Sequence, residues 1–127
     1  MDVFVYGTLT EHTTANAVLD EYEYRCPAEL VGLHRIDGRY PTLAPGGTTA
    51  GRILETPNVE ALDEYEGVDR GLYCQQSIPQ ADGSGTVACY IGDPKAVCAP
   101  AEWPGDGSFQ RRVERYCSQH GVVVRTV

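Results

Sequence analysis

Apolar and β-branched residues gather in short runs that Gly, Pro and polar turns interrupt, a pattern typical of strands. The strands predicted by these runs are residues 3–6, 28–35, 50–55, 72–79, 85–91 and 122–127. The polar turn at residues 81–84 joins two of them into a predicted hairpin. Two prolines and the Gly46-Gly47 pair predict a loop at residues 40–47, because both residue types break regular structure.

Three further stretches have the spacing or the end signals of helices. The predicted helices are residues 11–19, 58–66 and 109–120. Thr56-Pro57 matches a helix start, with a hydroxyl cap and a proline at the first helical position, and Gly67 matches a stop. Residues 93–107 are rich in loop-forming residues. Strands outnumber helices, so the pattern predicts an α+β fold built on a mostly antiparallel sheet or barrel.

The composition narrows the class of protein. The 127 residues include 10 Lys plus Arg and 18 Asp plus Glu, a formal net charge of -8, and 42% of them are apolar. This is a globular composition, and its acidity disfavours nucleic acid as a partner. The short apolar runs predict no membrane span, and the first residues lack a signal peptide, so we expect a cytoplasmic protein. The acidic surface is either adapted to high salt or simply acidic, and the oligomeric state is open.

The five cysteines indicate reduced thiols rather than a metal site. No C-x-x-C pair or zinc-finger spacing of histidines occurs, and the count is odd. We therefore expect buried, free thiols. A catalytic pair of one cysteine with His12, His34 or His120 stays open, although no recognisable nucleophile motif supports it.

One acid stands where the helical pattern calls for an apolar residue. At about 100° per residue, Val59, Leu62 and Glu66 fall within about 60° of one another, on the stripe expected to face inward. Burial and the helix C-terminus both disfavour the charged carboxylate and raise its pKa toward neutrality. The pattern leaves open that Glu66 bonds a core group or turns outward. The other acids of this stretch are expected to form a solvated face: Glu60, Asp63 and Glu64.

The first predicted strand ends in a segment suited to ligand binding. Gly7 lets the backbone approach a ligand closely, and successive N–H groups in such a turn bind a carboxylate or a carbonyl oxygen. Tyr6-Gly7-Thr8-Leu9 lacks the glycine spacing and the Lys of a phosphate loop. An ordinary turn at the end of a strand is the alternative.

Together these segments resemble the γ-glutamylcyclotransferase-like proteins, in the small AIG2-like branch. The resemblance rests, in this order, on Val5-Tyr6-Gly7-Thr8-Leu9, Gly38-Arg39-Tyr40-Pro41, Ala50-Gly51-Arg52-Ile53-Leu54, Leu62-Asp63-Glu64-Tyr65-Glu66-Gly67, Tyr73 and Ala88-Cys89-Tyr90. It covers roughly residues 3–91. Many relatives carry Gly, Pro and Asn after the first motif, whereas here only Asn16 corresponds.

The resemblance implies a single domain over residues 1–127, a small, mostly antiparallel β-barrel with flanking helices. It places the general acid/base at Glu66 and the substrate-binding loop at Tyr6, Gly7, Thr8 and Leu9. Several tyrosines are expected either to line the pocket or to belong to the core: Tyr6, Tyr40, Tyr73 and Tyr90.

The family chemistry is an intramolecular aminolysis. The α-amine of a γ-glutamyl group attacks its own γ-carbonyl, 5-oxoproline forms, and an amine or amino acid leaves. Glu66 is expected to move the protons, and backbone N–H groups from Gly7 to Leu9 to hold the oxygen or the substrate carboxylate. No metal or organic cofactor is required. Two alternatives stay open. One is a non-catalytic module that binds small molecules, and the other is a transferase or lyase that acts on another amide metabolite.

Overall fold

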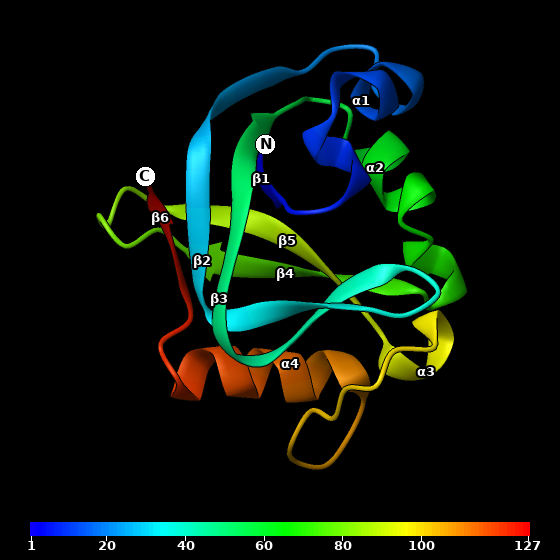
Figure 1. The fold of residues 1–127 in the computed structure, drawn as a ribbon, viewed down its shortest axis with the longest axis vertical. Helices are drawn as coiled ribbons and strands as arrows, with labels where there is room; N and C mark the ends of the chain where they lie inside the picture. Colours follow the sequence, from blue (N-terminus) through cyan, green and yellow to red (C-terminus); the bar gives the residue numbers. More distant parts are fainter.

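The computed structural model describes residues 1–127 and contains one curled sheet of six strands, in the order β4-β5-β1-β3-β2-β6 (Figure 1). The strands are β1 (Asp2–Val5), β2 (Glu23–Asp37), β3 (Pro41–Glu55), β4 (Tyr73–Pro79), β5 (Thr86–Gly92) and β6 (Val123–Thr126). All neighbours pair antiparallel except β1 with β5. Gln80, directly after β4, bridges Val124 of β6, so the two edges of the sheet meet at this point. The predicted α+β, barrel-like fold is confirmed.

Short helices flank the sheet at its two ends. They are α1 (His12–Val18), α2 (Val59–Tyr65), α3 (Pro94–Val97), α4 (Phe109–Gln119) and the 3-10 turns η1 (Thr8–Thr10) and η2 (Val68–Arg70). In Figure 1, α1 and α2 lie beside each other at one end of the sheet, and α4 lies at the opposite end. None of the helices combines the length and the apolar composition needed to cross a membrane.

The loop predicted at residues 40–47 is wrong, because β3 begins at Pro41. Strands β2 and β3 are 15 residues long each and pair from Glu23 opposite Glu55 to Asp37 opposite Pro41. β1 covers the other edge of β3 only from Arg52 to Glu55. The proline-containing part of β3 therefore has a strand neighbour on one side only, and there a missing N–H is tolerated.

The predicted start of the second helix is also wrong. α2 begins at Val59 with Asn58 as its cap, two residues after the Thr56-Pro57 signal. The buried Thr56 hydroxyl donates to the Glu21 carbonyl oxygen (2.5 Å) and accepts the Asn58 N–H (3.1 Å). Thr56 thus ties the segment after α1 to the entry of α2 instead of capping the helix.

All five cysteines are free thiols, and no histidine hydrogen-bonds to one of them. Cys89 and Cys117 are buried, as expected of small apolar side chains. The expectation of burial fails at Cys98, which is exposed at the end of α3, and it holds only in part at Cys26 and Cys74, which are half-buried.

Strand β1 is buried on both faces, which explains its continuous apolar sequence. Phe4 points into the larger core cluster, inside the curl of the sheet. Val3 and Val5 point to the other face, where they pack with Leu62 of α2. This alternation is the period of a strand, and it places β1 between the barrel interior and the helices.

The buried hydroxyl of Thr42 joins the start of β3 to the end of β5. It donates to the Gly92 carbonyl oxygen (3.1 Å) and accepts the Gly92 N–H (2.8 Å). Both residues are buried, so Gly92 has no water to replace this partner.

Thr42→Val keeps the shape of the side chain and removes both hydrogen bonds. We expect the free energy of unfolding to fall by on the order of 3 kcal/mol, because two buried backbone groups lose their partner. Urea denaturation of wild type and variant measures the change. Thr48→Val, at an exposed position of the same strand, is the control and is expected to change stability by less than about 0.5 kcal/mol. Equal effects of the two substitutions would contradict this role of Thr42.

Candidate active site

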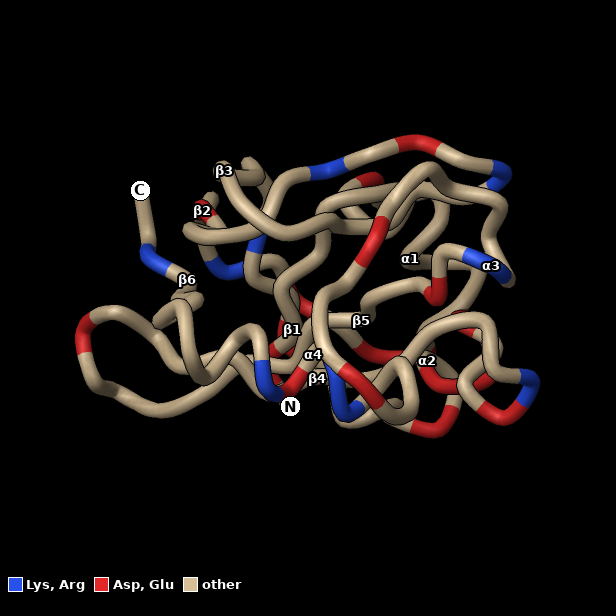
Figure 2. Tube along the Cα trace, turned by 90° about the horizontal axis from the view of Figure 1, so that it is seen from below, with Lys and Arg blue, Asp and Glu red and all other residues tan.

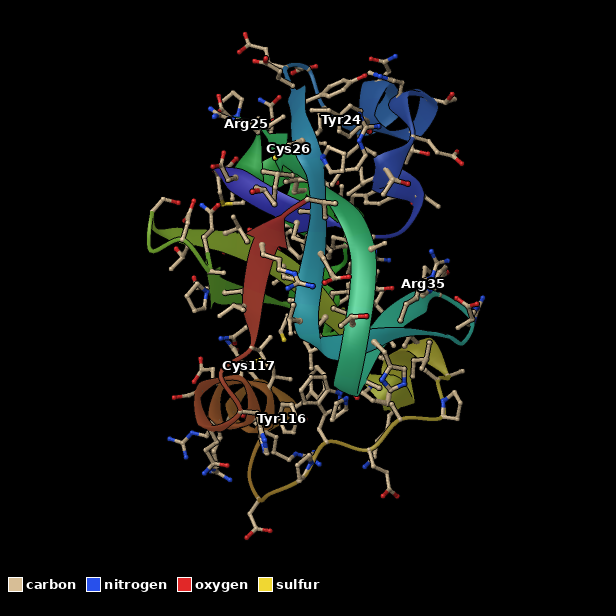
Figure 3. The ribbon with its side chains drawn as sticks, turned by 60° about the vertical axis from the view of Figure 1, so that its left-hand side comes forward. Tyr24, Arg25, Cys26, Arg35, Tyr116 and Cys117 are labelled. Carbon is tan, nitrogen blue, oxygen red and sulfur yellow. The ribbon has the colours of Figure 1, made fainter.

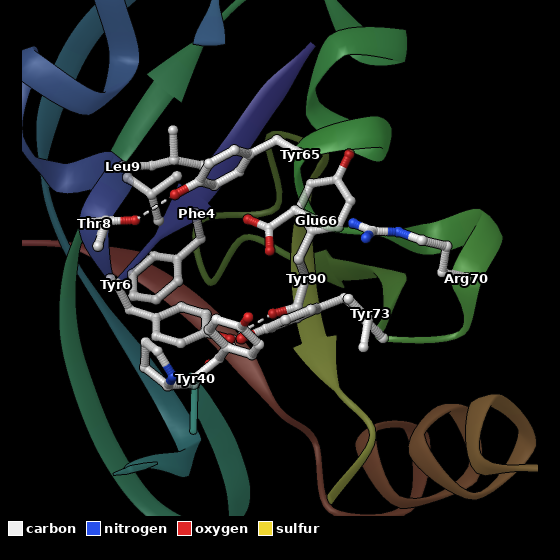
Figure 4. Close-up of a pocket in the computed structure, with 14 residues that line it drawn as sticks. Phe4, Tyr6, Thr8, Leu9, Tyr40, Tyr65, Glu66, Arg70, Tyr73 and Tyr90 are labelled. Atoms are coloured by element: carbon white, nitrogen blue, oxygen red, sulfur yellow. Dashed lines mark hydrogen bonds between the residues drawn. The ribbon is translucent and has the colours of Figure 1, made fainter. Parts of the chain in front are cut away.

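A pocket of about 360 Å³ opens beside the end of β1, between the β2–β3 turn and the end of α2 (Figure 4). Its lining residues are Phe4, Val5, Tyr6, Gly7, Thr8, Leu9, Tyr40, Pro41, Tyr65, Glu66, Arg70, Leu72, Tyr73 and Tyr90. The structure therefore brings together every site residue named from the sequence. Their roles in binding and catalysis stay predictions.

Glu66 is the single carboxylic acid of the pocket lining. It follows the last residue of α2, and its N–H still donates to the Leu62 carbonyl oxygen (2.9 Å). Its side chain points into the pocket (Figure 4), and no arginine or lysine nitrogen lies within 4.0 Å of the carboxylate. Burial raises the pKa of this carboxyl to about 7. The inward orientation predicted by the helical pattern is confirmed, without the core partner that was its alternative.

Tyrosine rings form the wall below Glu66. The buried Tyr6 hydroxyl donates to the Tyr90 carbonyl oxygen (2.6 Å), and the Tyr73 hydroxyl donates to the Pro41 carbonyl oxygen (2.5 Å). Desolvation raises the pKa of Tyr6 and of Tyr73, so both stay neutral phenols. Tyr6 is thus a core residue and a pocket residue at once, whereas Tyr40 lies half-exposed at the rim.

The carbonyl groups of the loop after β1 are all bound by donors of the protein. The Tyr6 carbonyl accepts a hydrogen bond from the Arg35 guanidinium (2.9 Å), the Gly7 carbonyl from the Thr10 N–H (3.1 Å) and the Thr8 carbonyl from the Glu11 N–H (3.1 Å). The Leu9 carbonyl accepts one from the Tyr24 hydroxyl, and the Thr10 carbonyl one from the Arg52 guanidinium (3.1 Å). Figure 3 shows that Tyr24 and Arg35 reach the loop from opposite ends of β2. The loop is therefore held along its whole length.

This anchoring decides where the N–H groups of the loop point. In a trans peptide, the carbonyl of one residue and the N–H of the next point in opposite directions, and the chain has no cis peptide. The N–H groups of Gly7, Thr8 and Leu9 are thus directed away from the donors that hold the preceding carbonyls. The Gly7 N–H has no acceptor within the chain. Such a row of oriented N–H groups suits an anionic oxygen.

The loop and α2 also meet across the mouth of the pocket. The Thr8 and Tyr65 hydroxyls lie 2.8 Å apart and hydrogen-bond to each other (Figure 4). Tyr65 was not predicted as a site residue, although it directly precedes Glu66. Its hydroxyl links the loop after β1 to the C-terminal end of α2, next to Glu66.

The prediction of a solvated face on α2 holds for Glu60 and Glu64 but is wrong for Asp63. The Asp63 carboxylate accepts the Tyr90 hydroxyl (2.6 Å) and the Gln75 amide (3.3 Å). These partners come from β5 and β4, which bound the pocket. Asp63 lies one helical turn before Glu66, so this network fixes the part of α2 that presents Glu66.

Further lining residues were not predicted as site residues, namely Phe4, Val5, Pro41, Arg70 and Leu72. A signal for Arg70 was present: it is the single basic residue between Arg52 and Lys95, within the most acidic stretch of the chain. Leu72 carried no such signal, since an apolar residue at the start of a strand is ordinary.

Comparisons with known proteins agree on one family. The family model "Gamma-glutamyl cyclotransferase, AIG2-like" matches residues 3–110. AIG2-like protein C of Arabidopsis thaliana is 37% identical over 76 residues, which cover 54% of this chain and 44% of that protein. This chain thus matches less than half the length of that relative.

Solved structures share the fold. A gamma-glutamyl cyclotransferase has a TM-score of 0.62 at 19% identity, over 73% of this chain and 66% of that one. An uncharacterized protein from Pyrococcus horikoshii has a TM-score of 0.59 at 16% identity, over 94% and 97% of the two chains. At these identities the likeness concerns the fold alone.

Burial of Glu66 predicts a pH dependence of stability. Its carboxyl titrates near 4.5 in the unfolded chain and near 7 in the folded chain, so the folded state binds more protons between these values. The free energy of unfolding therefore falls as the pH rises from 4.5 to 7, by on the order of 3 kcal/mol from this group. Glu66→Gln removes that contribution, so we expect it to be stabilised relative to wild type at pH 8 but not at pH 4.5.

Urea denaturation at the two pH values measures the difference between the variant and wild type. Glu64→Gln is the matched control, because it removes an exposed carboxyl from the same helix. It is expected to follow the wild-type pH dependence. A Glu66→Gln difference that stays constant between pH 4.5 and pH 8 would contradict the raised pKa.

Proposed function

Because this chain belongs to the gamma-glutamyl cyclotransferase, AIG2-like family, we propose that it is an enzyme that releases 5-oxoproline from a γ-glutamyl amine or amino acid. The observation that carries the proposal is the half-buried Glu66 carboxyl, which lines the pocket, has no hydrogen-bond or ion-pair partner in the chain and has its pKa raised to about 7 by desolvation. A group of this pKa accepts and returns a proton near neutral pH.

In the proposed reaction the γ-glutamyl group lies between the loop and Glu66. The N–H groups of Gly7, Thr8 and Leu9 hold an anionic oxygen of this group, because the anchored carbonyls leave them free to donate. The ring faces of Tyr6 and Tyr73 pack against its methylene chain. The substrate's own amine is thereby held near its γ-carbonyl, and the attack becomes intramolecular.

Glu66 moves the protons of this reaction. As a carboxylate it accepts a proton from the α-ammonium, and the free amine attacks the γ-carbonyl carbon to form the new carbon–nitrogen bond. The protonated Glu66 then donates this proton to the leaving nitrogen, and the old carbon–nitrogen bond breaks. The ring nitrogen passes its second proton to the released amine, so that 5-oxoproline and an alkylammonium ion result and Glu66 is again a carboxylate. One carboxyl serves both steps because its pKa lies near 7.

The proposal predicts the pH dependence of turnover. Since Glu66 must be unprotonated to act as base, kcat/KM for 5-oxoproline release is expected to rise with pH and to level off above about 7. Glu66→Gln is expected to lower kcat at least about 100-fold, because the substituted amide cannot exchange protons. Chromatographic assay of 5-oxoproline over pH 5 to 9 measures both effects.

Glu64→Gln serves as the control and is expected to keep both the rate and the pH profile of the wild type. Equal rates of Glu66→Gln and wild type would show that Glu66 is not the acid/base. If the wild type binds γ-glutamyl compounds saturably but releases no 5-oxoproline, the protein is a binding module and not an enzyme.

A further inference from the structure

The pocket contains one basic side chain, and this side chain has no partner. Arg70 is exposed and lines the pocket together with Glu66, but no carboxylate lies within 4.0 Å of its guanidinium and its side chain donates no hydrogen bond. Acidic residues are abundant around it, as Figure 2 shows for α2 and the turn that follows. An arginine that stays free among acids is available to a ligand, and its planar fork suits a carboxylate.

The backbone around Arg70 holds it over the pocket. Arg70 ends the tight turn η2, which lies between Gly67 and Gly71. Both glycines adopt left-handed conformations (φ 66° and 72°), which other residues rarely adopt. The Arg70 N–H donates to the Gly67 carbonyl oxygen (3.0 Å), and Nη2 lies 3.0 Å from where a Cβ at Gly67 would be. The guanidinium therefore folds back over the residue that follows Glu66.

Arg70 and the substrate loop lie on different sides of Glu66. In the view of Figure 4, Thr8 and Leu9 are on one side of the Glu66 carboxylate and Arg70 is on the other. In the proposed reaction the loop holds the γ-glutamyl group, and Glu66 protonates the leaving nitrogen. The part of the substrate beyond that nitrogen then extends toward Arg70.

We propose that Arg70 binds a carboxylate of the leaving group, so that the preferred substrates are γ-glutamyl amino acids rather than γ-glutamyl amines. This inference rests on the proposed function. In a γ-glutamyl amino acid, the second carboxylate is attached to the carbon next to the leaving nitrogen, so it lies close to Glu66 but beyond it. Arg70 suits a carboxylate in this position, because it lines the same pocket and its guanidinium lies more than 4.0 Å from the Glu66 carboxylate.

The charge of the protein adds a second reason. A γ-glutamyl amino acid carries two carboxylates and one ammonium, whereas a simple γ-glutamyl amine carries no net charge. A chain of net charge -8 repels the first substrate more than the second. The unpaired Arg70 cation at the pocket lining offsets this repulsion only for a leaving group that carries a carboxylate.

The test compares two substrates with the same γ-glutamyl group. γ-Glutamylalanine and γ-glutamylethylamine differ only in the carboxylate of the leaving group. We expect wild type to have the higher kcat/KM for γ-glutamylalanine. Arg70→Gln is expected to lower this value by about 10- to 100-fold, mainly through KM, and to leave kcat/KM for γ-glutamylethylamine unchanged. Arg70→Lys is expected to keep part of the preference.

Arg111→Gln is the matched control, since it removes one positive charge from an exposed position of α4. It is expected to leave both substrates unaffected. An equal loss for both substrates in Arg70→Gln, or a wild type without preference for γ-glutamylalanine, would overturn the role of Arg70 while 5-oxoproline release still supports the proposed function. Release of 5-oxoproline from neither substrate would overturn the proposed function, and this inference with it.

Discussion

The four residues of β1 join the two halves of the molecule. β1 pairs antiparallel with β3, which carries β2 and β6, and parallel with β5, which carries β4. A Cβ at Gly51 of β3 would collide with the Val5 carbonyl oxygen and the Phe4 ring, so the two strands approach too closely for any side chain there. The pairing of β1 with β3 and β5 therefore also positions the loop that starts at Gly7. The lining residues from Phe4 to Leu9 are thus placed by one short strand and the loop that follows it.

Local patterns predicted the features that depend on local physics. The hairpin of β4 and β5, the helix α4 and the inward side of α2 follow from period-2 and period-3.6 spacing, which near neighbours determine. Glu66 belongs to this class, because its orientation depends on its phase relative to Leu62, which is fully buried. The acid/base candidate was therefore visible before any tertiary structure was known.

The features that the sequence did not reveal depend on distant partners. Pro41 starts a strand because no other strand needs its missing N–H, which only the sheet order shows. Asp63 leaves the solvated face because Gln75 and Tyr90 reach it from two strands. Arg70 reaches the pocket through a turn between two left-handed glycines, and the spacing of side chains along the sequence does not predict the course of this turn. Function concentrates at such positions, since sites are assembled from separate elements.

The separation of Glu66 and Arg70 is the condition that allows both proposed roles. An ion pair between them would favour the charged carboxylate and lower the pKa of Glu66 far from neutrality. It would also occupy the guanidinium before a substrate arrives. With no basic nitrogen within 4.0 Å, burial alone sets the pKa of Glu66 at about 7, and the arginine stays free. In the proposed reaction, the leaving group fills the space between the two residues. The same gap therefore keeps the acid protonatable in the empty pocket and gives the second carboxylate of the substrate a place to bind.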